Sequence, residues 1–394
     1  MPEEITMAQS RFEKTAGAEP EKTPDRWKLW VLSAVCAAAA LAMLCGLALV
    51  GGSGRVAATG GASDAAIMDK FDMYITNQAS NALDGILDIK KVYWLSDTDL
   101  VAPEPNPANY GTANTPAELS WLLEEAAELI GGQEMLFGPD TRIWDGEPIR
   151  YYYDETILVI TWKEWIGRSM YTFSEVKIAH PSQFRRFLAN GEFGSDKQYV
   201  TTEMAKSVNA VVASSGDFYK FRQNGIVVHE GQIKRAELEK IDTCFIDDKG
   251  DLIFSPKGQF STLEEAQQFV EEHNIRFSLA FGPILIEDGV DCVPRKYPLG
   301  EISGTYSRIA LCQLGQQHYL LANATAQLVS QIPTDMRTFT NVLLGYGVEK
   351  AYALDGGQTT VIAMDGQLIT AVDFGHQRHI SDIIYFATAL PDGE

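Results

Sequence analysis

The chain has 394 residues, of which 45% are apolar and 10% aromatic, a composition typical of a folded globular protein and not of a disordered one. Its 53 acidic residues outnumber the 32 Lys and Arg residues. The formal net charge of −21 excludes a sequence-independent nucleic-acid binder, which needs a basic surface for the phosphates. Five cysteines without a C-x-x-C pair exclude a disulfide-framework fold and a thiolate zinc finger.

The first predicted element is one transmembrane helix over residues 29–50, an apolar run without any charged residue. At about 1.5 Å per residue such a helix crosses the hydrocarbon core of about 30 Å. Arg26 and Lys28 directly precede the run, and only Arg55 follows it closely. The positive-inside rule therefore predicts a cytoplasmic tail at residues 1–28 and an extracytoplasmic main domain.

A cleaved signal peptide is the alternative for this segment, because small residues at Val56-Ala57-Ala58 offer a processing site. The long leader and the length of the apolar run favour the membrane anchor. Both alternatives export the rest of the chain. Residues 65–394 hold 46 acidic and 26 basic residues, so nearly all the negative charge belongs to the exported part.

Residues 51–64 are predicted to be a flexible linker, and residues 65–150 a short helical extension with helices near 65–91 and 115–130. Pro103, Pro105 and Pro107 favour extended chain between the two helices. The second helix begins with a capping box from Thr115 to Glu118. The sequence leaves open whether this region is a separate stalk or part of the main domain.

Residues 151–394 are predicted to have an α+β fold, with mixed, largely antiparallel sheets and interspersed helices, because hairpins and helices alternate irregularly. A second capping box at Ser261-Thr262-Leu263-Glu264 opens a helix that reaches about Glu272, and Thr334 is expected to cap another that reaches Leu344. Hairpins are expected at residues 241–254, 308–322 and 359–371.

Several common catalytic motifs are absent from the sequence: the phosphate loop G-x-x-x-x-G-K-S/T, the zinc helix H-E-x-x-H, the nucleophile elbow G-x-S-x-G and the dinucleotide fingerprint. The remaining candidates for functional residues are the Asp-Gly pairs at the ends of predicted strands. Asp288-Gly289 and Asp365-Gly366 are predicted to be hairpin turns. Asp355 differs, because it ends an apolar strand and precedes Gly356-Gly357, whose exposed amides make a candidate polar site.

From about residue 151 to 390 the chain resembles the phosphodiester glycosidase family. Six blocks occur in the family's order: residues 204–219 with Gly216-Asp217, Gly225–Val228, Phe281–Leu285 leading to Asp288-Gly289, Arg308, Leu354-Asp355-Gly356-Gly357, and Ile380–Tyr385. The resemblance implies an α+β hydrolase that acts on a sugar joined through its anomeric carbon to a phosphate diester. For an exported, membrane-anchored protein, the implied substrate is a cell-surface or secreted glycopolymer.

Carried onto this sequence, the family pattern implies Arg308 as the phosphate-binding residue, and Asp355 and Asp217 as catalytic carboxylates. The implied substrate-binding residues are Ser215, Gly356, Gly357, Thr359 and Thr360. No cofactor is predicted. A divalent metal at the aspartates stays open, because no ligand spacing requires one.

Departures from the pattern motivate a second hypothesis, a degenerate family member that binds a glycopolymer without cleaving it. Gln358 and Thr359 replace a glycine and a serine, and Ala322-Asn323-Ala324 stands where an acidic and a basic residue are expected. A third hypothesis is a structural partner in an envelope assembly. The sequence leaves open the oligomeric state and whether Cys244, Cys292 and Cys312 form a disulfide.

Overall fold

The computed structural model describes Leu95 and residues 101–217, 219–221, 223–298, 302–325 and 334–390, all of which belong to one compact unit spanning Lys90–Glu394. The predicted membrane helix at 29–50, the linker at 51–64 and the helix near 65–91 lie outside the described residues. Within the described ranges, no helix has the length and apolarity needed to span a membrane.

The largest element of the unit is a nine-stranded sheet in which neighbouring strands are antiparallel. In spatial order its strands are β1 (Tyr110–Ala113), β2 (Ile149–Asp154), β3 (Ile157–Ile166), β4 (Ser169–Ile178), β15 (His318–Thr325), β14 (Arg308–Gly315), β16 (Lys350–Ala353), β12 (Ile284–Glu287) and β13 (Val290–Asp291). β3 and β4 are long because aromatic and β-branched residues fill them on both faces.

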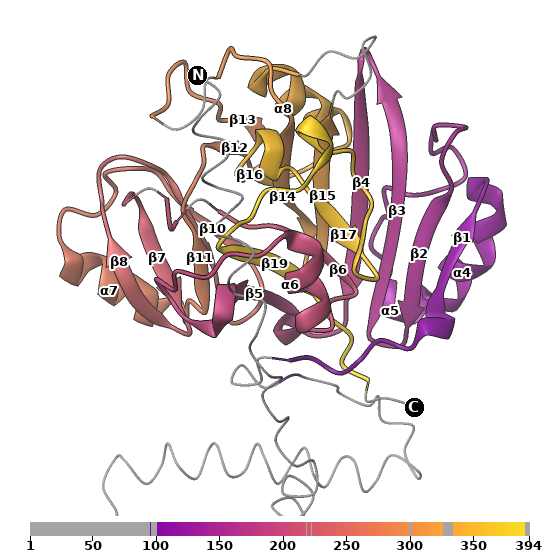
Figure 1. Cartoon of the computed structure of the whole chain (residues 1–394), viewed down its shortest axis with the longest axis horizontal. Coiled ribbons are helices and arrows are strands. Elements are labelled where there is room, and N and C mark those ends of the chain that lie inside the picture. Colours follow the sequence, from indigo (N-terminus) through magenta and orange to yellow (C-terminus); the bar gives the residue numbers. More distant parts are fainter. Residues whose placement is uncertain are drawn as a thin grey trace, which may run out of the picture. The chain divides into compact units, whose positions relative to one another are not determined.

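A five-stranded antiparallel sheet packs face to face against the middle of the large sheet (Figure 1). Its strands are, in order, β18 (Gln367–Leu368), β17 (Ile362–Met364), β6 (Val212–Ser215), β19 (Asp382–Phe386) and β5 (Phe184–Leu188). The main core lies between the two sheets, where Leu311 and Leu321 of the large sheet meet Ile362 and Ile384 of the smaller one.

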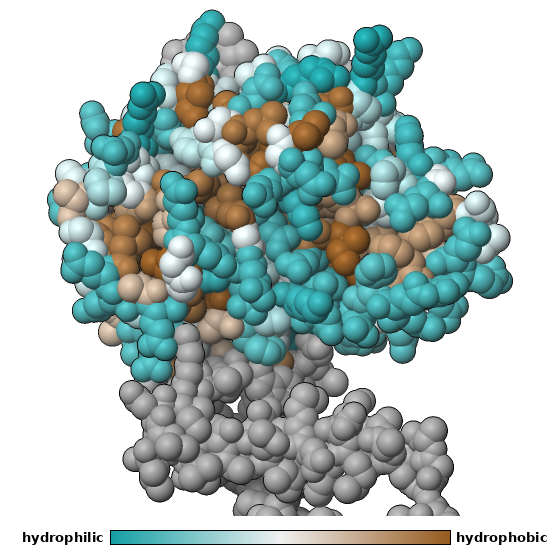
Figure 2. All heavy atoms as spheres, turned by 180° about the vertical axis from the view of Figure 1, so that it is seen from behind, coloured by the Kyte–Doolittle hydropathy of each residue, from teal (hydrophilic) through white to brown (hydrophobic). Residues whose placement is uncertain are grey.

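Helices cover the outer faces of both sheets, so the unit has four layers. α4 (Ser120–Glu125), α5 (Ala127–Ile130) and α8 (Met336–Gly345) bury apolar side chains against the nine-stranded sheet. α6 (Thr201–Ser207) covers the five-stranded sheet. Seen from behind, the described surface is mostly hydrophilic, with apolar residues gathered in smaller patches (Figure 2).

A smaller lobe extends from one side of this sandwich (Figure 1). It contains the hairpin β7 (Ile226–His229) and β8 (Gln232–Ala236), the sheet β10 (Leu252–Ser255), β9 (Thr243–Ile246) and β11 (Phe277–Leu279), and α7 (Leu263–Glu272). Its own apolar core joins α7 to β7 and β9 through Val270, Val228 and Phe245.

Short 3-10 helices connect the main elements. They are η1 (Pro107–Asn109), η2 (Pro116–Leu119), η3 (Pro181–Gln183), η4 (Ala189–Gly191), η5 (Gly357–Thr359) and η6 (Asp373–Gly375). Three of them begin with a proline, whose fixed φ suits a first helical position.

The predicted α+β class is confirmed. The predicted capping box at Thr115 is wrong, because the Thr115 hydroxyl donates to Glu118 and caps no backbone amide, and the segment begins with η2. Two further helix starts differ from the prediction by one residue. Thr262, and not Ser261, caps α7, because its hydroxyl accepts from the Glu265 amide at 3.2 Å. Asp335, and not Thr334, caps α8, where its carboxylate accepts from the Thr338 amide at 3.0 Å. Each prediction was displaced by one residue because two neighbouring polar side chains can both serve as caps.

Residues 101–150, the continuously described part of the segment predicted as a helical extension, contribute to the large sheet and its core. β1 pairs with β2, and Leu119, Leu122 and Ile130 belong to the core on that sheet's outer face. The boundary that the sequence suggested at residue 150 therefore falls inside β2.

The predicted hairpin turns and the cysteines have clear positions. Asp288 and Asp365 have φ of 51° and 52°, and each precedes a glycine with positive φ, as a type I′ turn requires. Cys244 and Cys312 are buried and Cys292 is exposed, and all three are free thiols.

Candidate active site

The loop after β16 carries Asp355 and is shaped by two glycines and a threonine. Gly357 has φ of +66° and donates its amide to the Ser307 carbonyl at 2.8 Å. A Cβ on Gly356 would lie 2.7 Å from the same oxygen, so only glycine fits. The Thr359 hydroxyl bonds to the carbonyls of Asp355 and Gly356 at 2.9 and 2.8 Å. The predicted motif is thus a fixed turn at the end of a buried strand.

Arg308 begins the strand that lies beside this loop. Ala310 of β14 faces Ala353 of β16, and the Leu354 amide donates to the Ile309 carbonyl at 3.0 Å. Continuing this antiparallel register places Arg308 beside Asp355 at the same end of the sheet. The backbone register therefore places these two predicted catalytic residues at the same end of the sheet.

The Arg308 side chain is buried and held in place by backbone groups. Its Nε donates to the Thr334 carbonyl at 3.4 Å, its Nη2 donates to the Gly304 carbonyl, and its guanidinium lies 5.2 Å from the centre of the Tyr306 ring. Such restraint fixes the direction of the guanidinium fork, which is what recognition of a phosphate requires.

Thr360 and Asn323 form a buried polar pair next to the Asp355 loop. The Asn323 amide donates to the Thr360 carbonyl at 3.3 Å, and both residues are buried. The Thr360 hydroxyl and the Asn323 side-chain oxygen have no hydrogen-bond partner in the described part of the chain. Two unsatisfied polar atoms in an interior position are consistent with a binding role for Thr360.

The structure places Asp217 in a buried cluster just beyond the end of β6. One carboxylate oxygen accepts from Arg186 at 2.8 Å and from the Tyr219 amide at 2.9 Å, and the other accepts from the Ala280 amide at 2.6 Å. Its side chain is 0% exposed. These contacts favour a positioning role for Asp217, and its predicted catalytic role stays a prediction. Ser215, also buried, ends the same strand.

Asp382, which the sequence did not indicate as a site residue, completes this cluster. It accepts from Arg186 at 2.9 Å and from the Asp217 amide at 3.2 Å. Burial raises the pKa of Asp382 to about 7, although the charge of Arg186 lowers it, and the nearby Asp217 raises it further. The sequence signal that could have identified Asp382 is its position as a charged residue directly before the apolar run Ile383–Phe386.

Only glycine fits at position 216, the first residue of the predicted Gly216-Asp217 pair. A Cβ at this position would lie 2.0 Å from a carboxylate oxygen of Asp382. The absence of a side chain therefore lets Asp382 approach the backbone and accept the next amide.

The segment 280–282 connects this cluster to the strand that carries Asp355. The Ala280 amide binds Asp217, the Phe281 amide donates to the Tyr352 hydroxyl at 3.0 Å, and the Gly282 amide donates to the Ala353 carbonyl at 3.2 Å. Asp217 thereby supports the scaffold around Asp355 from one side.

Two further residues near the loop come from η6 and its surroundings. Asp373 accepts from the Ser307 hydroxyl at 2.7 Å, and the Gln358 amide donates to the His376 carbonyl at 3.2 Å. His376 therefore lies beside the loop, in contact with the Gln358 side chain. Asp373 was not predicted, because nothing in the sequence links it to Ser307.

The residues do not form a recognisable metal centre within the described ranges, where no group of three or more His, Cys, Asp or Glu side chains has a metal-binding arrangement.

The comparison with family models covers the candidate site. The model of the phosphodiester glycosidase family matches residues 208–387. Residues 208–387 are therefore similar to the phosphodiester glycosidase family. The match includes Arg308, Asp355 and Asp217, and it bears out the resemblance and the class of enzyme that the motifs implied. No curated protein sequence matches the chain.

Solved structures similar to this chain include the catalytic domain of zebrafish N-acetylglucosamine-1-phosphodiester alpha-N-acetylglucosaminidase auto-inhibited by its pro-peptide, at 15% identity and a TM-score of 0.47, covering 66% of this chain and 92% of that one. A hypothetical protein from Synechocystis has 15% identity and a TM-score of 0.44, with 61% and 64% covered. A putative exported protein from Burkholderia pseudomallei has 11% identity and a TM-score of 0.37, with 56% and 74% covered.

Proposed function

We propose that this chain hydrolyses the bond between the anomeric carbon of a sugar and a phosphate diester. The observation that carries the proposal is the position of Arg308 beside Asp355 at one end of the β14–β16 pair, within the region that matches the phosphodiester glycosidase family. A cation and a carboxylate at one site suit a reaction in which a phosphate leaves while water attacks.

In the proposed reaction, the Arg308 guanidinium binds the phosphate oxygens and stabilises their negative charge. Asp355 accepts a proton from the attacking water, whose oxygen bonds to the anomeric carbon. The bond from that carbon to the phosphate oxygen breaks, and its electron pair leaves with the phosphate. The products are a free sugar and a phosphate monoester. Thr360, next to this loop, would hydrogen-bond a sugar hydroxyl.

The proposed substrate is a cell-surface or secreted glycopolymer, and the proposed location of the domain is outside the cell membrane. The apolar run at residues 29–50, flanked by Arg26 and Lys28, supports an anchor with its N-terminus in the cytoplasm. A tethered enzyme would meet polymers that are themselves attached to the envelope.

A non-catalytic, glycopolymer-binding protein is the second candidate function. Two observations favour it: Gln358 occupies the place of a family glycine and bonds to His376, and the Asp217 carboxylate is used by Arg186 and two backbone amides. Such a protein would keep the recognition of phosphate by Arg308 and lack turnover.

An assay of the purified full chain with a methyl diester of N-acetylglucosamine 1-phosphate tests both candidates. We expect release of free sugar and methyl phosphate, and a loss of at least about 100-fold in kcat for Asp355→Asn. The matched control is Asp365→Asn, which changes an exposed carboxylate in a hairpin turn before Gly366. Binding of the diester without any release of sugar would instead establish the second function.

A further inference from the structure

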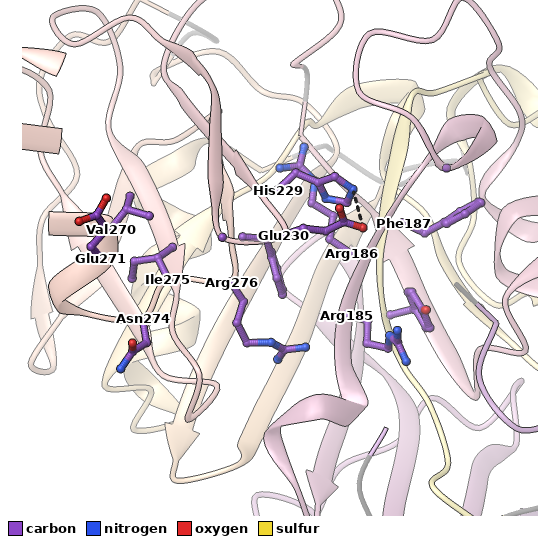
Figure 3. A pocket seen from close by; sticks show the side chains of 14 residues that line it. Arg185, Arg186, Phe187, His229, Glu230, Val270, Glu271, Asn274, Ile275 and Arg276 are labelled. Atoms are coloured by element: carbon purple, nitrogen blue, oxygen red, sulfur yellow. Dashed lines mark ion pairs between the residues drawn. The ribbon is translucent and has the colours of Figure 1, made fainter. Parts of the chain in front are cut away.

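A groove with a volume of about 830 Å³ separates β5 of the five-stranded sheet from the smaller lobe (Figure 3). Arg185 and Arg186 of β5 line one side, and His229 at the end of β7 and Arg276 before β11 line the other. None of the residues predicted for the active site lines it.

The floor of the groove is cationic, although the chain as a whole is strongly acidic. Arg185 is buried and Arg276 is half-buried, whereas the two glutamates of the lining, Glu230 and Glu271, are exposed. Solvent screens exposed charges more than buried ones, so the arginines dominate the field at the floor. Arg186 is engaged in ion pairs with Asp217 and Asp382, so we do not count it among the groups that bind an anion.

The groove's histidine adds a neutral hydrogen-bonding group. Burial, and then the charge of Arg186, lower the pKa of His229 to about 4, so its ring is uncharged at neutral pH. Its Nε2 lies 3.9 Å from a carboxylate oxygen of Glu230, whose side chain is exposed (Figure 3).

Arg185 and Arg276 reach into the same part of the groove (Figure 3). Arg185 faces Tyr385 across the β5–β19 pair. Burial raises the pKa of Tyr385, and the positive charges of Arg185 and Arg276 oppose this rise. Arg276 is oriented by the carbonyls of Pro181 and Phe184, to which it donates at 3.0 and 3.3 Å.

We propose that this groove is a second anion site, in which Arg185 and Arg276 bind a phosphate or carboxylate group of a glycan. Arg276 is held by two backbone carbonyls and Arg185 is buried beside the groove. A guanidinium fork suits a planar or tetrahedral oxyanion, which it can bind through two oxygens. The site goes beyond the proposed hydrolysis, because it requires only binding and none of the residues assigned to the reaction.

Isothermal titration of the full chain in non-ionic detergent tests the site, with inorganic phosphate, glucuronate and neutral glucose as probes. We expect phosphate and glucuronate to bind in a salt-dependent manner and glucose to show no binding. Arg185→Gln and Arg276→Gln should each weaken binding at least tenfold. The matched control is Arg337→Gln on α8, which removes an exposed arginine outside the groove and should leave both affinities unchanged. The tighter of the two anions identifies the group that the site prefers.

A second variant keeps the test decisive if loss of the Arg276 backbone contacts impairs folding. Arg276→Lys retains the charge without the fork, so we expect phosphate affinity between those of the wild type and Arg276→Gln. Wild-type phosphate affinity in both Arg185→Gln and Arg276→Lys, or no anion binding by the unaltered chain, overturns the proposal. Because binding needs no turnover, a chain that binds phosphate in the groove but releases no sugar contradicts only the proposed hydrolysis.

Discussion

At the scale of single residues, the cluster around Arg186 dictates what position 216 can hold. A Cβ on Gly216 would sit 2.0 Å from an Asp382 oxygen and would displace that carboxylate from Arg186 and from the Asp217 amide. We expect Gly216→Ala to lower the free energy of unfolding by about 3 kcal/mol, through overpacking and a weakened buried ion pair. Chemical denaturation followed by tryptophan fluorescence measures this. Gly138→Ala, where the new Cβ meets no atom within 4 Å, is the control and should change little.

Asp382 gives this cluster a pH dependence whose sign is fixed by its raised pKa. The folded chain takes up a proton at Asp382 near pH 7, whereas the unfolded chain does so only near the ordinary value of about 3.9. Stability should therefore rise as the pH falls from about 8 to about 5, and Asp382→Asn should reduce that slope. Unfolding at several pH values checks this, with Asp365→Asn as the exposed control. Equal slopes in the wild type and Asp382→Asn would contradict it.

At the scale of elements, the structure shows which of two neighbouring polar residues, Ser261 and Thr262, caps α7. The sequence alone could not distinguish them. Thr262 supplies the capping hydroxyl, whereas Ser261 contributes only its backbone amide, which donates to Glu265 at 2.7 Å. We expect Thr262→Ala to cost about 1 kcal/mol of unfolding free energy and Ser261→Ala to cost much less. Thermal or chemical unfolding of the two variants decides between them, and a larger effect at Ser261 would restore the cap that the sequence suggested.

Local signals explain which elements were predictable. The hairpins β9–β10 and β14–β15 follow from short strand-like segments on either side of a turn, and helix α7 ends at Glu272 as its pattern indicated. The caps were displaced because Ser261 and Thr262 are each followed three residues later by a glutamate. The placement of β1 in the large sheet was not predictable. Its partner β2 follows only after helices α4 and α5, so no local turn signal links the two strands.

The candidate site was predictable only in part, for a similar reason. The turn at Asp355 is encoded locally by Gly356 and Gly357. Its position beside Arg308 depends on the pairing of β14 with β16, which the sequence does not specify. The contacts of Asp217 with Arg186 and Asp382 join three strands that are distant in the chain, so apolar patterning carries no signal for them.

At the scale of the whole molecule, charge is distributed unevenly around the sites. Residues 65–394 carry 46 acidic and 26 basic residues, and this excess of negative charge repels a polyanionic polymer at long range. Arg308 and the pair Arg185 and Arg276 are therefore local exceptions in an unfavourable field. Physiological salt reduces the repulsion over about 8 Å, so binding depends on these buried cations and not on long-range steering.

The proposed membrane anchor and a cleaved signal peptide predict different behaviour of the whole chain. We expect the full chain to remain in the membrane fraction after alkaline carbonate washing, with its N-terminus intact by mass spectrometry. Leu41→Arg places a charge in the apolar run, at a cost of about 3 kcal/mol for a central helix position, and should release or destabilise the chain. Trp27→Arg, outside the run, is the control and should stay in the membrane fraction. A washed-off chain that begins near Ala58 would establish cleavage, and it would remove the anchor while leaving the proposed hydrolysis open to the same assay.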